Sequence, residues 1–261
     1  MARVLLFTVP CVLAVATAAC DSPCRAIEEL PEDQAILAIG DSVLGIHYTT
    51  CEGVPGQLAT VLGNRITSFA VPDRPVSSPS GSDDIQSQYT SASWDWVLMS
   101  GGVNDLIQEC RCNANVDEAA CAQAIDELIS EDGTRGEIPT LAERALADGA
   151  RVMLVGYYNV PDDAALNFDA CAPQVTELTE RYRAFTTATE GVEYFIGLRP
   201  MNVWIIRTPK GCEFDTSAVM LFGEHPERFF WDRIHPSPTG AHDIAVEVAA
   251  LMQRIDAQSP E

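Results

Sequence analysis

The chain has 261 residues, of which 47% are hydrophobic and 21% are charged, a composition typical of a globular protein rather than of a disordered one. Its 38 acidic residues outnumber 16 basic ones and give a formal net charge of -22, which repels phosphate backbones and anionic lipid headgroups. We therefore expect one domain, a monomer, and no nucleic-acid partner.

The N-terminus is typical of an export signal. Arg3 supplies a positive start, an apolar run follows at 4–19, and small residues end that run. We therefore expect a signal peptide at 1–19, a tether rich in Pro, Asp and Glu at 20–34, and the folded domain at 35–261. Because the apolar run is short for a membrane span and no later run is long enough, no span is expected in the mature chain.

The cysteines bear on the compartment. Cys20 follows two alanines and resembles the lipidated cysteine of a bacterial lipoprotein, although Thr17 stands where such signals usually carry Leu. We expect an exported protein, either secreted or held as a periplasmic or cell-surface lipoprotein, with a lipid on Cys20 as its one possible membrane contact. Eight cysteines remain after cleavage before Cys20, enough for four disulfides, whereas a lipidated Cys20 leaves an odd thiol.

The stretch from Cys110 to Cys121 invites comparison with a zinc site. Its spacing fits no common pattern of zinc ligands, so we expect disulfides that staple a long loop, with a connectivity that the sequence does not define. We expect neither a metal ion nor any other cofactor.

The elements that follow alternate along the chain. Short apolar runs predict strands at 35–39, 65–71, 94–99, 151–157 and 192–196, and apolar residues at helical spacing predict helices at 140–147, 174–189 and 240–255. Gly149 stands where a helix should stop before a strand, and the irregular region 200–231 is expected to form a long loop or short helices. Alternating strands and helices predict an α/β fold, a three-layer α/β/α sandwich whose parallel sheet binds ligands beyond the carboxyl ends of its strands.

Three short motifs lie where strand ends or their loops would present them. They are Gly40-Asp41-Ser42, Gly102-Val103-Asn104-Asp105 and Asp232-Arg233-Ile234-His235. Each one alone is ordinary: the first two are common as turns or helix caps, and an Asp three residues before a His is often a solvated surface pair. Their combination at one edge of a parallel sheet indicates a catalytic site.

The residue types in these motifs are those of nucleophilic catalysis. The Ser42 hydroxyl needs a base to take its proton, and His235 is the candidate, with the Asp232 carboxylate fixing and stabilising its imidazole ring. The oxyanion that forms needs donors, which we assign to the Asn104 side-chain amide and the Ser42 N–H. Gly81, the only glycine between Gly63 and Gly101, is the expected third donor.

The three motifs resemble the blocks of the SGNH (GDSL-type) hydrolase family, and the resemblance covers nearly the whole mature chain. The final block, which runs from Asp232 to His242, is the most complete. The resemblance implies a flavodoxin-like sheet, a metal-free Ser-His-Asp mechanism and ester substrates. Two positions depart from the pattern: Val43 stands where Leu often follows the serine, and the glycine block around Gly81 is loose.

Two other functions remain open. A metal-dependent phosphoesterase also uses Asp, Asn and His at strand ends, but its Asp-x-His and Gly-Asn-His motifs are missing. A non-catalytic surface protein could keep the same fold to bind glycans or a partner. For an esterase we expect a small ester or an acylated glycan as substrate, with short acyl chains.

Side chains near these motifs have less specific interpretations. We expect surface or structural roles for His47, His225 and His242. Trp204 and the aromatic run 229–231 are candidate walls of the substrate site.

Overall fold

The computed structural model describes residues 23–47, 49–112, 115–157, 170–196, 204–208, 211–215 and 235–258. Its centre is a five-stranded sheet in which every neighbouring pair is parallel, with the strand order β2-β1-β3-β4-β5. This order is that of flavodoxin-like sheets, so the predicted fold class is confirmed. The strands are β1 (Ile36–Ile39), β2 (Ile66–Ser68), β3 (Trp96–Met99), β4 (Arg151–Gly156) and β5 (Val192–Ile196).

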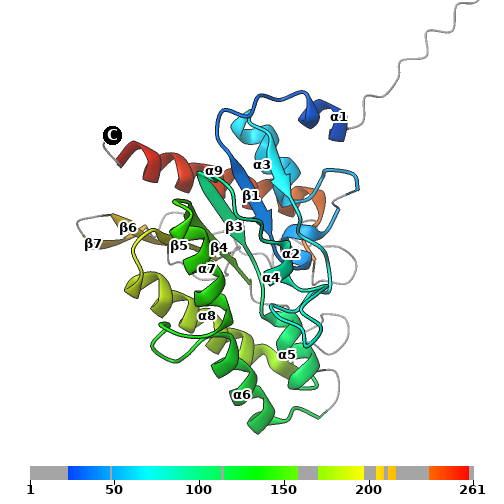
Figure 1. The fold of residues 1–261 in the computed structure, drawn as a ribbon, viewed down its shortest axis with the longest axis vertical. Helices are drawn as coiled ribbons and strands as arrows, with labels where there is room; N and C mark the ends of the chain where they lie inside the picture. The colour runs from blue at the N-terminus through cyan, green and yellow to red at the C-terminus, as the bar shows by residue number, and fades with distance from the viewer. Residues whose placement is uncertain are drawn as a thin grey trace, which may run out of the picture.

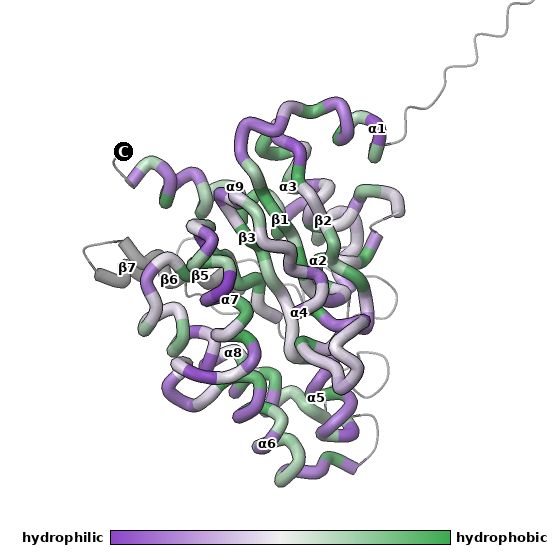
Figure 2. Tube along the Cα trace, viewed as in Figure 1, coloured by the Kyte–Doolittle hydropathy of each residue, from purple (hydrophilic) through white to green (hydrophobic). Residues whose placement is uncertain are grey.

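The strands form where continuous apolar runs allow burial on both faces. All residues of β1 and β3 are buried, as a parallel sheet covered by helices requires. Figure 2 shows these central strands as largely hydrophobic, with hydrophilic residues gathered on the outer helices. The five predicted strands are confirmed, each with ends within a few residues of the prediction.

Helices cover both faces of the sheet (Figure 1). Helices α3 and α9 pack against each other on one face, and α7 and α8 pack against β4 on the other. The predicted closing helix is α9, which buries the expected apolar face that includes Ile244, Val248 and Met252. The helices are α1 (Pro23–Glu28), α2 (Ser42–Gly45), α3 (Val54–Leu62), α4 (Ile85–Gln88), α5 (Val103–Glu109), α6 (Glu118–Leu128), α7 (Glu137–Ala147), α8 (Ala172–Ala188) and α9 (Pro238–Gln258).

Two segments have structure that the sequence analysis does not predict. Within the region expected to be a loop or short helices, β6 (Trp204–Thr208) and β7 (Gly211–Asp215) pair as an antiparallel hairpin, which their β-branched and aromatic residues favour. The expected tether at 20–34 contains α1, and a disulfide between Cys24 and Cys51 fastens this helix to the loop before α3. This segment is therefore bonded to the domain from residue 24 onward.

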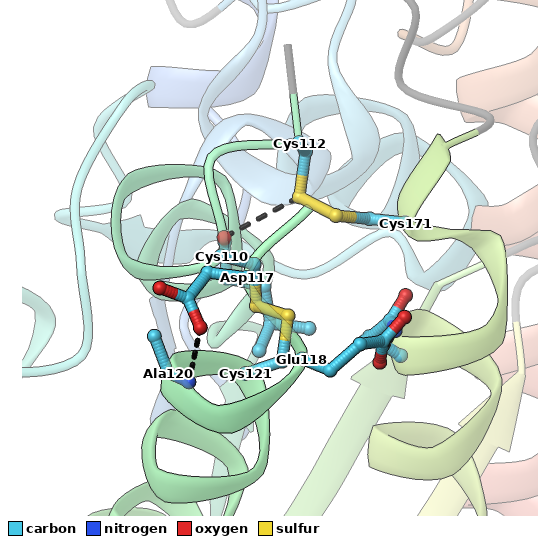
Figure 3. The surroundings of a disulfide bond; sticks show 9 residues. Cys110, Cys112, Asp117, Glu118, Ala120, Cys121 and Cys171 are labelled. Carbon is cyan, nitrogen blue, oxygen red and sulfur yellow. Dashed lines mark hydrogen bonds between the residues drawn. A yellow bond between two sulfur atoms is a disulfide. The ribbon is translucent and has the colours of Figure 1, made fainter. Parts of the chain in front are cut away.

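Two more disulfides lie close to each other where the end of α5, α6 and the start of α8 meet (Figure 3). Cys110 bonds to Cys121 and joins the end of α5 to α6, while Cys112 bonds to Cys171 at the start of α8. The predicted stapling of the region between Cys110 and Cys121 is confirmed. Among the described residues, none of the helices is both long enough and apolar enough to cross a membrane.

Candidate active site

Ser42 is placed by a sharp turn between β1 and α2. Gly40 has φ +149°, and a Cβ added there would lie 2.3 Å from the Ser100 side-chain oxygen and 2.7 Å from its carbonyl oxygen, so the turn requires glycine. Asp41 then caps α2 by accepting from the Val43 N–H at 3.1 Å. Ser42 is therefore the first residue of a helix and is half-buried, and its N–H lies at the unsatisfied, positive end of that helix.

A buried polar network holds this turn. The Asp41 carboxylate accepts from the Ser100 hydroxyl at 2.9 Å and from the Tyr157 hydroxyl. The same Tyr157 oxygen accepts from the Val103 N–H at 3.2 Å. Burial raises the pKa of Asp41, and the hydrogen bonds that it accepts, led by that from Tyr157, act in the opposite direction. Asp41 of the first predicted motif and Val103 of the second are thus joined in one network.

The second motif begins α5 and anchors the loop that follows β2. The Asn104 side-chain amide donates to the Arg74 carbonyl oxygen at 3.1 Å. The two carboxylate oxygens of Asp105 accept from the Val76 N–H at 3.1 and 3.0 Å. Since a primary amide has two N–H groups, Asn104 can hold Arg74 with one and offer the other to an oxyanion.

Asp105 has an unusual titration. Burial raises the pKa of its carboxyl to about 7, the negative charges of Glu137 and Asp41 add to the rise, and the hydrogen bond from Val76 lowers it. The carboxyl is thus destabilised in its charged form, and it keeps that form at neutral pH only in part.

Gly81 is not held near the motifs by any contact among the described residues. It is exposed at φ +61°, and its N–H donates to the Ser78 carbonyl oxygen at 2.9 Å within a turn. The part of the loop that contacts the second motif lies closer to β2, at Arg74 and Val76. A third oxyanion donor at Gly81 stays a prediction, and this N–H would have to leave its turn to serve.

His235 lies just before α9, whose first turn is capped by Ser237. The Ser237 hydroxyl accepts from the Gly240 N–H at 3.2 Å. His235 is half-buried. After burial and the hydrogen bonds to Tyr157, Val43 and Ser100, an electrostatic interaction with His235 is the last of the influences on the pKa of Asp41, and it lowers that pKa. Asp232, its predicted partner, lies outside the described residues.

The other predicted residues are spread more widely. His242 is exposed on α9 and its Nδ1 lies 3.2 Å from the Gln57 side-chain oxygen on α3, a structural role as expected. His47 is half-buried in the turn after α2, with φ 60°. Trp204 belongs to β6; His225 and the aromatic run 229–231 lie outside the described residues.

Sequence reasoning missed the side chains that brace the site. Ser100 and Tyr157 directly follow β3 and β4, and both are buried. Gln88 brackets Gly40, accepting from its N–H at 2.7 Å and donating to its carbonyl oxygen at 3.1 Å. Polar residues at the carboxyl ends of predicted parallel strands were the available signal for Ser100 and Tyr157, whereas nothing local marked Gln88.

One group of potential metal ligands occurs among the described residues, and it lies apart from these motifs. The sulfur atoms of Cys110, Cys112 and Cys171 lie within 4.8 Å of one another. All three are oxidised in disulfides, so they offer no thiolate, which is the form that binds zinc.

The chain is similar to several known proteins. The family model described as GDSL-like lipase/acylhydrolase matches residues 36–248. The structure of TesA has a TM-score of 0.53 at 16% identity, with 85% of this chain and 99% of that chain covered. A candidate SGNH hydrolase from Slackia heliotrinireducens has a TM-score of 0.50 at 18% identity, with 84% and 98% covered. No curated protein sequence matches the chain. The structures share the fold, and the matched family model shows that the chain belongs to the GDSL-like lipase/acylhydrolase family of carboxylic ester hydrolases.

Proposed function

We propose that the protein is an exported serine esterase that forms an acyl-enzyme on Ser42, with His235 as the base and Asp232 as its carboxylate partner. The observation that carries the proposal is the buried network below Ser42. Through Asp41 and Tyr157 it ties the start of α2 to the start of α5. This network supports a nucleophile and an oxyanion donor side by side at the carboxyl edge of the sheet, and we propose that His235, just before α9, completes the site as the base.

The proposed reaction follows the roles of these groups. His235 takes the proton of the Ser42 hydroxyl as its oxygen attacks the ester carbonyl carbon. The oxyanion accepts from the Asn104 amide and the Ser42 N–H. The intermediate then collapses, and the alcohol leaves with the proton from His235. Water, deprotonated by His235, releases the acid and restores the hydroxyl.

Hydrolysis of a nitrophenyl ester tests this mechanism. Replacing Ser42 or His235 with alanine should lower kcat by at least ~1,000-fold, as removal of a nucleophile or its base does in serine hydrolases. The matched control is His242→Ala, which removes an exposed imidazole on α9 and should leave kcat unchanged. Equal activity of Ser42→Ala and the native protein would contradict the proposal.

The competing functions predict other outcomes. A metal-dependent phosphoesterase would lose activity with EDTA and would cleave phosphate esters, whereas the serine mechanism should be insensitive to the chelator. A non-catalytic binding protein would hydrolyse no ester and gain no adduct from a fluorophosphonate. Adduct formation on Ser42 in the native protein therefore separates the esterase from the binding protein.

The substrate is proposed to be a small ester or an acylated glycan with a short acyl group. Nitrophenyl esters of increasing chain length, followed by acetylated glycans, test this choice. The rate should fall beyond short chains. Rates that keep climbing past about eight carbons, where each buried CH₂ contributes about 0.8 kcal/mol, would favour a lipase instead.

Export is the remaining part of the proposal. Three disulfides among the described residues support an oxidising compartment. The intact mass of the mature protein should equal that of a chain that begins at Cys20. If the chain is a lipoprotein, the mass of a diacylglycerol should be added. A mature chain that retains residues 1–19 would contradict this part alone.

A further inference from the structure

The Tyr157 hydroxyl is a buried group that ester hydrolysis does not use directly. It follows β4 and has only 9% of its surface exposed. Its oxygen makes two hydrogen bonds, donating to an Asp41 carboxylate oxygen and accepting from the Val103 N–H at 3.2 Å. Asp41 is the neighbour of Ser42 and Val103 is the neighbour of Asn104. One hydroxyl therefore lies one hydrogen bond away from each of two catalytic segments.

These contacts fix the direction of the hydrogen bonds. The Val103 N–H can only donate, so the Tyr157 oxygen must accept from it and use its own proton toward Asp41. Burial and the charge of Asp41 raise the pKa of Tyr157 well above its usual range, so the phenol stays protonated and keeps donating. Because the Tyr157 hydroxyl has a single proton, it can donate to Asp41 only in this orientation. The same orientation leaves its oxygen free to accept from the Val103 N–H, so one hydroxyl links the two segments.

We propose that Tyr157 is a positioning residue whose hydroxyl sets the start of α2, with Ser42, against the start of α5, with Asn104. This inference rests on the proposed esterase function. Other contacts also hold each segment, since Ser100 donates to Asp41 and Asn104 donates to Arg74. Among the described side chains, however, Tyr157 is the one that bonds to both segments at once.

Loss of this link should affect the transition state more than substrate binding. Without the hydroxyl, the Asp41 carboxylate and the Val103 N–H each lose a partner in a buried site. A shift of about 1 Å between nucleophile and oxyanion donor can cost on the order of 100-fold in rate. The affinity for the ester, which depends on the substrate walls, should change little.

The test compares two tyrosine variants. Tyr157→Phe should lower kcat by ~10- to 100-fold while KM stays within about twofold of the native value. The control is Tyr89→Phe: Tyr89 is also buried and also donates to an aspartate, Asp148, at 2.6 Å, but that aspartate lies between α7 and the start of β4, and among the described residues it makes no hydrogen bond to either motif. This substitution should lower stability without changing kcat. Equal kcat for native and Tyr157→Phe protein would overturn the inference.

A double-mutant cycle tests whether Tyr157 acts through Asp41. Asp41→Asn keeps the shape of the side chain but removes its charge. If Tyr157 works through this carboxylate, the double variant should lose no more activity than the worse single variant. Multiplying losses would show independent effects and would contradict the proposed route.

A spectroscopic measurement covers the case in which Tyr157→Phe does not fold. Replacing Tyr157 with 3-fluorotyrosine keeps both ring and hydroxyl. Its ¹⁹F resonance should shift when a fluorophosphonate reacts with Ser42, and the same label at Tyr89 should not respond; an unmoved label at 157 would overturn the inference. Native protein that neither hydrolyses esters nor reacts with the reagent would instead refute the proposed function.

Discussion

The raised pKa of Asp105 predicts a pH-dependent loss of stability that one substitution should remove. With an unfolded value of 3.8 and a folded value of about 7, the folded protein binds the proton more tightly than the unfolded chain does. Stability therefore falls as the pH rises from the lower value to the upper one, and above pH 7 the full cost is present. Each pKa difference of one unit is worth about 1.4 kcal/mol.

The size of the effect follows from the same two values. Between pH 5 and pH 8 the cost of ionising Asp105 in the folded state should grow by about 2.5 kcal/mol. Asp105→Asn keeps an oxygen that can accept from the Val76 N–H but cannot ionise. The free energy of unfolding of both proteins is measured in urea across this pH range, with the disulfides intact. In the difference between the two proteins, the titration of all other groups cancels. The native protein should lose stability relative to the variant as the pH rises, and a constant difference would refute the reasoning.

Three further predictions concern the site and its support. Asn104→Ala should lower kcat by about 100- to 1,000-fold with little change in KM, as loss of one oxyanion donor does, and steady-state kinetics would check it; an unchanged kcat would remove Asn104 from the mechanism. Gly40→Ala should destabilise the fold by at least ~2 kcal/mol, because its Cβ would lie 2.3 Å from the Ser100 side-chain oxygen at a φ of +149°; an unchanged melting temperature would count against the turn. Replacing Cys112 and Cys171 together with serine opens a loop with a sequence separation of 59 and should cost about 4 kcal/mol in urea unfolding, and a loss below ~1 kcal/mol would show that the link constrains little.

The sheet was predictable because its strands carry their own evidence. The residues of β1 and β3 are apolar throughout and are followed by Gly40 and Ser100, and parallel strands buried on both faces leave such a pattern. The first motif follows β1, and its Ser42 begins α2, as the sequence predicts. The placement of this motif required only local sequence and the rule that strand ends share one edge.

The contacts that hold the site in place were harder to predict from the sequence, because they join segments that lie far apart along the chain. Tyr157 meets Asp41 across 116 positions of the chain, and Gln88 meets Gly40 across 48. No local pattern specifies such partners. Gly81 stays a prediction that rests only on the rarity of glycine in that loop, and the contacts to α5 that the structure shows come from Arg74 and Val76.

A crystal structure of the protein with a phosphonate bound to Ser42 would test the central claim most directly. The account predicts the phosphonyl oxygen within hydrogen-bond distance of the Asn104 amide, and a ring nitrogen of His235 about 3 Å from the serine oxygen. A ring nitrogen more than ~5 Å away, with no water between, would show that His235 cannot take that proton.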